Sequence, residues 1–587
     1  MKYLLTGMIA LTLLTGCGQK DKAGAGASPA SVVFSAADLP EVSLRKGDPA
    51  TAGAALSAFS LAESGSGRLS FAGSKVDGDK AVFNDVILSI PADTSAPAES
   101  AYTDEDVAEM FSYMDMDGDG TADDGSGTTL ESLKAELQAP VTPDVPPVVK
   151  AAKMEFDGLG MIDGAANFSL MKLSDITITP AEGSEEQSSG KIASIELVNP
   201  SPETAAWVAS LLGKGEPAPF PEGKALSFDR WMVNGVNFDM SDASGKGLFT
   251  IDSMHISDLK EEKAGLIGLS NLKFDFTEAE GTDVKVSLEG FGIKGIDYGL
   301  FSEAVSAGAG AATDPAALSA AIQSDPANPG YDVLSIKAFK ADVVGASVDM
   351  ASLASSVTRD KQGRATKVVT EPFTITVGSR DNADGEQFAS ALATMGYETL
   401  TFSGQGESLY DPDADIVTLP KGKNFWKLND GFKLDFSAKY AGQKAIAAAQ
   451  LTTLEEEADP EAMLNAMMDS LVVHQIEFAL DDDGILDRAL NAYAAQSGED
   501  PAAVRSQLSG MFAMAPMFAA STGIDTAVVT ELATALSSFV TEPKTLTITL
   551  APKTPLKAQA FVDAMNAPQD PTKKLTKETL GFAAGNK

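Results

Sequence analysis

The chain has little cysteine, little histidine and few positive charges. One cysteine and two histidines occur among 587 residues, and 83 acidic residues outnumber 44 basic ones. A single cysteine cannot form an intrachain disulfide, so stability must come from buried surface. The formal net charge of −39 repels nucleic acid and anionic lipid headgroups. Basic residues such as Lys153, Lys172, Lys273 and Lys285 are scattered among carboxylates, so the sequence excludes nucleic-acid binding.

The same scarcity argues against the common catalytic machineries. No Gly-x-Ser-x-Gly nucleophile elbow occurs. His474 shares the apolar face of a predicted strand with Val472 and Ile476, which predicts a hydrogen-bonded core histidine, and His255 lies between two apolar neighbours on another predicted strand. No carboxylate pair stands out among the many possible pairs. The sequence therefore favours a non-enzymatic protein, with a carboxylate-dependent hydrolase of envelope glycan or lipid as an alternative.

The N-terminus carries one short apolar run, from Tyr3 to Leu14, after the positive charge of Lys2. The run is too short to span a bilayer and is typical of a signal-peptide core, and no second run reaches the ~20 residues that a spanning helix needs. Residues 14–17, Leu-Thr-Gly-Cys, resemble the lipobox of bacterial lipoproteins. The resemblance implies a signal peptide over residues 1–16 and a diacylated Cys17 at the mature N-terminus. The lipid would then be the membrane anchor of an envelope protein.

The residues after Cys17 indicate which membrane would hold the protein and how far the folded part lies from it. Gly18 is not the aspartate linked with inner-membrane retention in enteric bacteria, which favours the outer membrane, on its periplasmic face or at the surface. Residues 17–47 are rich in Gly, Ala, Ser, Lys and Asp without sustained periodicity. We expect this stretch to be a flexible tether.

Beyond the tether, apolar and polar residues alternate with period two in many segments. The clearest apolar sets are Val86/Leu88/Ile90, Val236/Phe238/Met240, Leu272/Phe274/Phe276, Val284/Val286/Leu288, Phe373/Ile375/Val377, Phe432/Leu434/Phe436 and Leu546/Ile548/Leu550. Such strands have one buried and one hydrated face, as in antiparallel sheets. We expect an α+β fold in which one or more large, curved antiparallel sheets carry Ala-rich helices, with a helical segment near the C-terminus.

Helices are predicted where Asp or Ser precedes Pro. The clearest begin at Asp48-Pro49, Pro202 (ending at Leu212) and Asp500-Pro501. The expected domain boundaries give an N-terminal α+β segment at 48–150, a β-rich region with helical insertions at 151–454, and a helix-rich region with strands at 455–587.

One acidic loop resembles the first half of an EF-hand. The residues that match or complete its oxygen shell are Asp115, Asp117, Asp119, Thr121, Asp123 and Glu131. Ser126 occupies the position where the family has a bidentate Glu, so Glu131 either closes an enlarged loop or forms a capping box with Thr128. The sequence leaves two interpretations open: a weak Ca²⁺ site, or a solvated acidic turn.

Two further motifs have structural interpretations. Gly290-Phe291-Gly292-Ile293-Lys294-Gly295 satisfies the dinucleotide fingerprint formally, but in an antiparallel context we expect these glycines to mark a bulge or close packing. The Met-rich run from Met511 to Phe518 predicts core packing, with an adaptable surface for acyl chains or a partner as the alternative.

Long amphipathic strands alternating with Ala-rich helices, as in Leu392–Leu419, Leu471–Leu490 and Thr541–Leu550, resemble envelope proteins of proteobacteria, including those related to the AsmA family of elongated β-groove proteins. AsmA-type proteins usually have a membrane-spanning N-terminus, whereas this chain has a lipobox. The resemblance implies a protein that binds a lipid or another apolar envelope component in a β-groove, or that scaffolds an envelope partner. A calcium-stabilised structural or adhesive module is the alternative.

Overall fold

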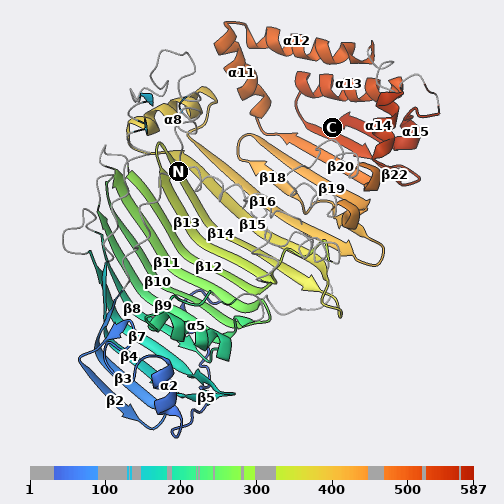
Figure 1. Ribbon diagram of the computed structural model, residues 1–587. Coiled ribbons are helices and arrows are strands. Elements are labelled where there is room, and N and C mark those ends of the chain that lie inside the picture. The colour runs from blue at the N-terminus through green and yellow to red at the C-terminus, as the bar shows by residue number, and fades with distance from the viewer. Residues whose placement is uncertain are drawn as a thin grey trace.

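The computed structural model describes residues 32–89, 111, 129–130, 133–134, 147–180, 188–219, 221, 225–241, 245–278, 283–297, 325–446, 468–517, 524–567, 570 and 572–587. It confirms the expected α+β class, because one antiparallel sheet of 21 strands dominates the molecule and helices lie against it (Figure 1). The sheet runs from the blue N-terminal end to the red C-terminal end of Figure 1 and curves along the way. None of the described helices is both long and apolar enough to cross a membrane.

The strands of the large sheet are β1 (Leu69–Ser70), β2 (Gly73–Asp77), β3 (Lys80–Leu88), β4 (Val148–Asp157), β7 (Leu170–Thr179), β8 (Ser189–Val198), β9 (Phe228–Ser241), β10 (Gly245–Lys260), β11 (Lys263–Glu278), β12 (Asp283–Asp297), β13 (Val333–Val343), β14 (Ala346–Arg359), β15 (Ala365–Ser379), β16 (Thr399–Asp411), β17 (Ile416–Leu419), β18 (Phe425–Leu428), β19 (Phe432–Ala441), β20 (Val472–Asp482), β21 (Thr545–Leu550), β22 (Leu556–Lys557) and β23 (Phe582–Asn586). Strands β5 (Gly160–Ile162) and β6 (Ala165–Asn167) form a separate hairpin. The helices are η1 (Ala36–Asp38), α2 (Ala52–Ala58), α5 (Pro202–Leu212), α8 (Ala383–Thr394), α11 (Ile485–Ser497), α12 (Pro501–Met514), α13 (Thr526–Thr541), α14 (Gln559–Asn566) and α15 (Lys577–Leu580).

Strand pairing follows the chain order closely. From β7 to β16 each strand pairs with the next one in sequence. Two sequence-predicted domain boundaries lie within this continuous sheet. The boundary at 150/151 falls inside β4, and β19 pairs with β20 across the boundary at 454/455. Hydrogen-bonded pairing between strands joins the predicted domains into one sheet. Sequence composition, from which the boundaries were predicted, carries no information on strand pairing.

One face of the sheet is apolar across many strands. Directly paired residues share a face, and the following ladder is apolar at every strand from β3 to β14: Phe83, Met154, Leu173, Ile195, Val233, Met254, Leu269, Phe291, Ile336 and Leu353. The opposite face carries polar ladders such as Thr250, Lys273, Ser287, Lys340, Asp349, Thr376 and Thr401. The period-two alternation in the sequence thus corresponds to an apolar face and a polar face of one sheet.

A line of backbone irregularities crosses the sheet. In every second strand from β3 to β13 one residue adopts a positive φ, namely Asp85, Asp175, Gly235, Asn271 and Ala338. Direct pairing is skipped at each of these positions, but the register is the same on both sides of the line. In β15 the register shifts between Thr370 and Phe373, and a bulge of this kind bends its strand and increases the local twist.

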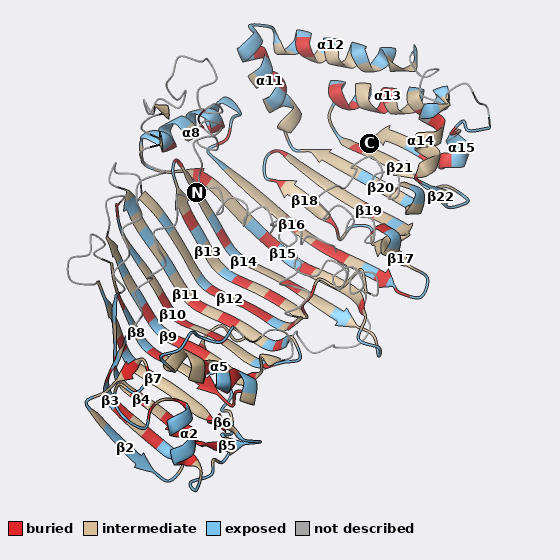
Figure 2. Ribbon diagram, in the orientation of Figure 1, coloured by how far each residue is buried: buried red, intermediate tan, exposed pale blue. Residues whose placement is uncertain are grey.

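Buried residues recur along the strands of the sheet (Figure 2), and most of the largest fully buried side chains lie at its N-terminal end. Phe59, which follows α2, stacks on Phe156 with ring centroids 5.7 Å apart, and Phe168 contacts both rings edge-on. The predicted first helix is present but shorter than expected. Asp48 caps a turn by accepting from the amide of Ala50 at 3.0 Å, and α-helical hydrogen bonding begins at Ala52.

Residues 32–48, which we name the strap, lie across the polar face. The amide of Ala36 donates to Ser253 Oγ (2.9 Å), Arg230 Nη1 donates to the Pro40 carbonyl (3.2 Å), and Arg45 Nη2 donates to the Pro200 carbonyl (2.6 Å). The flexible tether predicted for residues 17–47 therefore does not extend to residue 47. Small side chains in the strap give no periodicity, but its extended backbone finds partners on the sheet.

The last strand of the sheet is covered by a helix. The amide of Ala584 in β23 donates to Glu531 Oε1 of α13 at 3.1 Å, and Asn586 Nδ2 donates to the Glu542 carbonyl at 2.8 Å. Phe539 on α13 packs with Leu546 of β21 in the same layer. Covering an edge in this way removes unpaired backbone groups that would otherwise recruit another strand.

Candidate functional site

The residues proposed from sequence for lipidation and metal binding lie outside the described residues: Cys17, Asp115, Asp117, Asp119, Thr121, Asp123 and Glu131. Within the described part of the chain, no group of three or more His, Cys, Asp or Glu side chains is close enough to hold a metal ion. The calcium and lipidation hypotheses therefore stay predictions from sequence.

An apolar cavity of about 450 Å³ lies between α5 and the apolar face; Figure 1 shows α5 beside β9 and β7. It contacts every strand from β3 to β11 in the large sheet, and α5 forms its roof. Its lining is Leu69, Val86, Leu88, Val149, Lys150, Ala151, Met154, Met171, Leu173, Ile176, Ile195, Leu197, Thr204, Trp207, Val208, Leu211, Leu212, Leu226, Phe228, Trp231, Ile256, Leu259, Ala264 and Ile267. This volume lies within the range of small-molecule and cofactor sites.

The helix above the cavity forms where the sequence predicts it. Ser201 caps the helix by accepting from the amide of Thr204 at 3.1 Å, and Pro202 occupies the first helical position. Trp207, Val208 and Leu211 extend from α5 toward the sheet and line the cavity. A helix with apolar residues at this spacing normally closes a core, yet here a large space remains beneath it.

The cavity offers almost no polar group to a ligand. Apart from the indole N–H groups of Trp207 and Trp231, only Lys150 and Thr204 among its lining residues carry polar side-chain groups. Lys150 is exposed, so its ammonium stays hydrated. The Thr204 hydroxyl contacts Ser201 Oγ at 3.0 Å and the Ser227 backbone at 3.2 Å, so it is already paired. A guest in this cavity is therefore held by apolar contact.

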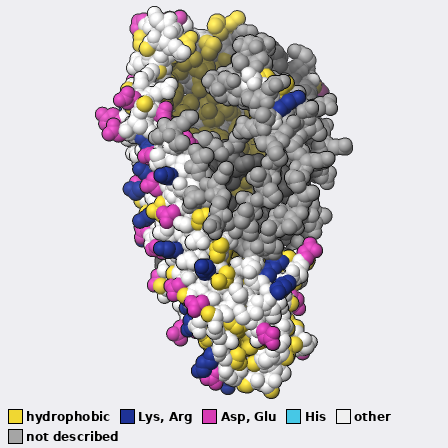
Figure 3. All heavy atoms as spheres, turned by 60° about the vertical axis from the view of Figure 1, so that its left-hand side comes forward, with side chains coloured by type: hydrophobic (Ala, Val, Ile, Leu, Met, Phe, Trp, Pro, Cys, Tyr) yellow, Lys and Arg dark blue, Asp and Glu magenta, His cyan; other side chains and the backbone are white. Residues whose placement is uncertain are grey.

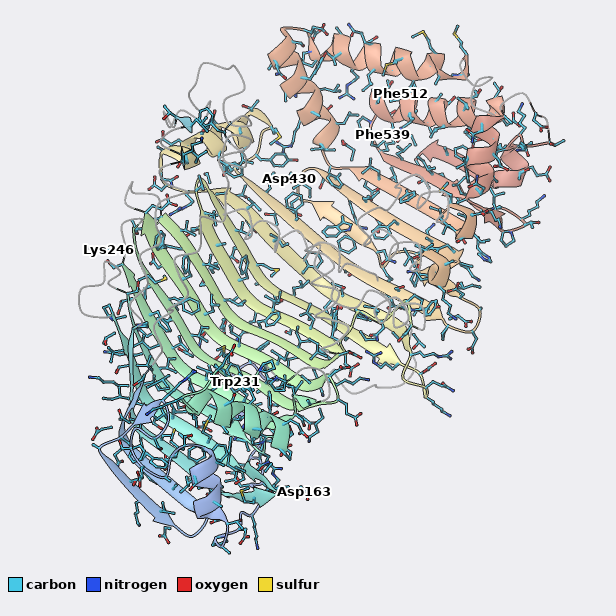
Figure 4. All side chains as sticks on the ribbon, in the orientation of Figure 1. Asp163, Trp231, Lys246, Asp430, Phe512 and Phe539 are labelled. Carbon is cyan, nitrogen blue, oxygen red and sulfur yellow. The ribbon has the colours of Figure 1, made fainter. Side chains whose placement is uncertain are left out.

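Two of the three tryptophans in the chain line the cavity. Trp207 comes from α5, and Trp231 from β9; Figure 4 shows Trp231 on the sheet beside α5. The third, Trp426, lies in β18 against Phe373, with ring centroids 5.7 Å apart. The two cavity tryptophans supply a fluorescence signal specific to the site.

Apolar side chains also gather away from α5. Figure 3 shows hydrophobic side chains in a hollow in the upper part of one side of the molecule. Phe249, Phe274 and Val286, which form one directly paired ladder of the apolar face, are only half-buried. The apolar face thus continues beyond the cavity.

The two histidines lie in different environments, and one of them corrects a prediction from sequence. His474 is only partly buried, and its strand neighbour Phe478 is 46% exposed, so the core-histidine prediction at this position is wrong. A register shift in the β19–β20 pairing next to Tyr440 changes the alternation there. His255 is the buried histidine, at 1% exposure, and neither ring nitrogen has a hydrogen-bond partner.

Burial lowers the pKa of His255 to about 4, and the positive charge of Arg230 adds to the effect. The imidazole is therefore neutral at pH 7. It lies beneath the strap, on the face opposite the cavity, since a Cβ added to Gly268 would meet both His255 Cε1 and the Val33 carbonyl. This position makes His255 part of the strap packing and not of the cavity.

The glycine motif has the structural role that the sequence predicts. A Cβ added to Gly290 would lie 2.8 Å from the ring of Phe34, and one added to Gly292 would lie 2.1 Å from Val32 Cγ1. Gly295 adopts a positive φ of 63°. These glycines mark close packing against the strap and a left-handed backbone position.

The Met-rich run is not a core segment. Met511, Met514 and Met517 are 56%, 53% and 77% exposed. The prediction of core packing is therefore wrong for these residues, because α12 packs on α13 through Arg505 and Ser509 and directs the methionines outward. Phe518 lies outside the described residues.

Sequence reasoning found the apolar strands and α5 but not the cavity between them. Its only advance signal was the bulk of the side chains at the apolar positions, for example Trp207 on the helix and Trp231 on the strand. Side-chain size alone does not reveal whether a helix and a sheet pack tightly, because backbone separation decides that.

Comparison with known families matches residues 425–581 to a family model described only as an uncharacterized protein. The match covers β18 to α15 and does not include the cavity. No match was found among curated proteins or among solved structures.

Proposed function

We propose that this protein binds a lipid or another apolar component of the bacterial envelope in the cavity beneath α5. In this proposal the protein is non-enzymatic, and a lipid on Cys17 anchors it to the outer membrane. The cavity carries the proposal, because its lining is apolar apart from the hydrated Lys150 and the already paired Thr204.

Energetics favours an apolar guest in this cavity. The cavity is partly open to solvent, and its surface is almost entirely apolar. A hydrocarbon guest removes this surface from water and gains roughly 25 cal/mol for each Å² of apolar surface buried.

The remaining apolar face supports the same proposal. Three or more neighbouring strands contribute half-buried aromatic and aliphatic side chains beyond the cavity, as in the ladder from Phe249 through Phe274 to Val286. Contiguous apolar surface of this kind marks a binding or interaction site in a soluble protein. The polar head of a lipid whose chain fills the cavity can remain at its border.

The test is mass spectrometry of an organic extract. The full chain with Cys17→Ala, which carries no covalent lipid, is purified from cells without detergent and extracted. Stoichiometric phospholipid or another acyl lipid supports the proposal. A clean extract contradicts it and favours a structural or interaction module with a closed core.

A variant links any lipid found to the cavity. Ala151 is 4% exposed and lines the cavity, while the next residue, Ala152, is exposed. Ala151→Phe places a ring in the cavity and should reduce the lipid recovered, whereas Ala152→Phe should not. Equal recovery from both variants would place the lipid elsewhere.

A further inference from the structure

Resting on the proposed function, we infer that the cavity takes one linear hydrocarbon chain, inserted end first with its polar head outside, and rejects compact polycyclic ligands. The inference names the ligand class of that site. It rests on the length of the cavity, on its lack of internal hydrogen-bonding groups, and on the way in which α5 is held at both ends.

The cavity extends across many strands. Its lining comes from seven strands that neighbour one another in the sheet: β3, β4, β7, β8, β9, β10 and β11. Adjacent strands lie about 4.8 Å apart, so six spacings correspond to roughly 29 Å along the curved sheet. An extended chain can contact all seven strands at once, whereas a compact ring system reaches only some of them.

The interior cannot satisfy a polar group. The Thr204 hydroxyl already contacts Ser201 and Ser227, and Lys150 is exposed. Burying a hydroxyl or carboxylate without a partner costs several kcal/mol. The methyl end of a chain therefore enters the cavity, and the polar end stays where water can reach it.

The roof cannot open easily. At its start, α5 is held by the Ser227 carbonyl, which accepts from the amide of Ser201 at 2.7 Å and from the Thr204 hydroxyl at 3.2 Å. At its end, the Leu212 carbonyl accepts from the amide of Arg68 at 2.7 Å, and Arg68 Nη2 donates to the Gly215 carbonyl at 2.8 Å. A ligand that requires α5 to swing away would break both sets of bonds, whereas a chain can slide beneath a fixed helix.

The cavity tryptophans allow a direct test on the full chain with Cys17→Ala. Trp426→Phe is added so that Trp207 and Trp231 are the only emitters. Stearic acid brominated near its methyl end, or near its carboxyl end, serves as a quenching ligand. We expect the methyl-end bromine to quench the fluorescence more strongly, because that end lies beneath α5.

Competition then tests shape with matched head groups. Palmitic acid should restore the fluorescence by displacing the brominated acid, and cholesteryl hemisuccinate, also a carboxylate, should not. Equal displacement by both compounds, or equal quenching from both bromine positions, would overturn the linear-chain inference while leaving lipid binding intact.

Failure of the proposed function gives a different result. In that case neither brominated acid quenches the fluorescence, and the organic extract is clean. A control protein with Trp207→Phe and Trp231→Phe retains Trp426 as its emitter, and quenching of that protein would show that bromine is reporting on a site other than the cavity.

Discussion

The strands β9 to β11 are covered loosely by α5 on their apolar face and tightly by the strap on their polar face. On the apolar face, α5 stands off from Trp231, Ile256 and Ile267 and leaves about 450 Å³. The residue after Ile267, Gly268, faces the polar side of the sheet. The strap lies so close to it that a Cβ at Gly268 would be 2.7 Å from the Val33 carbonyl. Neighbouring positions in one strand thus support a cavity on one side and tight packing on the other.

The difference shows how side-chain volume sets the distance between layers. Large side chains on both the helix and the strands hold backbones apart, whereas glycines let an extended segment approach backbone to backbone. The tight layer contributes stability, and the loose layer provides room for a guest. Three experiments test this comparison, and a fourth tests the calcium hypothesis beside it.

The largest effect is expected from filling the tight layer. Gly268→Val puts a branched side chain where a Cβ already lies 2.3 Å from His255 Cε1 and 2.7 Å from the Val33 carbonyl. We expect the free energy of unfolding, measured by denaturant titration, to fall by about 3 kcal/mol as the strap is displaced. Gly73→Val in β2 is the control, since the nearest atom to its Cβ is 3.9 Å away. Equal losses in both variants would contradict a specific role for the strap.

The second effect concerns acid. Because the pKa of His255 is lowered from 6.5 to about 4 by burial and by Arg230, the unfolded chain binds a proton more readily than the folded one between these values. Stability from the neutral imidazole is complete above pH 6.5 and is lost progressively as the pH falls to about 4. We expect a loss of about 2 kcal/mol between pH 7.5 and pH 5.

His255→Leu removes this titration, so its stability should depend less on pH over the same interval. Denaturant titrations of both proteins at pH 7.5 and pH 5 measure the difference. The strap should respond with the histidine, and hydrogen exchange at the amide of Ala36, which donates to Ser253 Oγ, reports on it. If the free energy of unfolding of His255→Leu fell as much between pH 7.5 and pH 5 as that of the wild-type protein, protonation of His255 would not be the cause of the loss of stability in acid.

A third effect should be smaller and independent of both faces. If the acidic loop binds Ca²⁺ with a dissociation constant of ~10⁻⁴–10⁻³ M, 1 mM Ca²⁺ stabilises the fold by about 0.4–1.4 kcal/mol. Chelation should then lower the melting temperature of the wild-type protein but not that of a variant with Asp115→Asn and Asp119→Asn. Identical melting of the wild-type protein with and without chelator would remove the calcium hypothesis.

The smallest change in stability is expected from filling the loose layer. Ala264 is 1% exposed and lines the cavity. Ala264→Phe should alter the free energy of unfolding of delipidated protein by less than about 1 kcal/mol, because the new ring enters existing space and not a packed core. A loss as large as that of Gly268→Val would mean that the cavity does not accept added volume.

Much of the fold follows from local sequence. Alternation in segments such as Leu272–Phe276 predicts a strand with two unlike faces, and the Ser201-Pro202 pair predicts the start of α5 at the correct residue. The strap was missed because residues 32–47 have no periodicity and acquire order only from partners more than a hundred residues away, such as Ser253 for Ala36. His474 was assigned to the wrong environment because a register shift beside Tyr440 changes the alternation there.

The sequence by itself determined an acidic chain, an N-terminal segment that resembles a lipoprotein signal, and amphipathic strands with one apolar side, because charge, short motifs and period-two alternation are local properties. Only the tertiary structure decided that the strands form one curved sheet and that α5 leaves a cavity against it. These features depend on register and on the distance between layers, which are set by contacts between residues far apart in the chain.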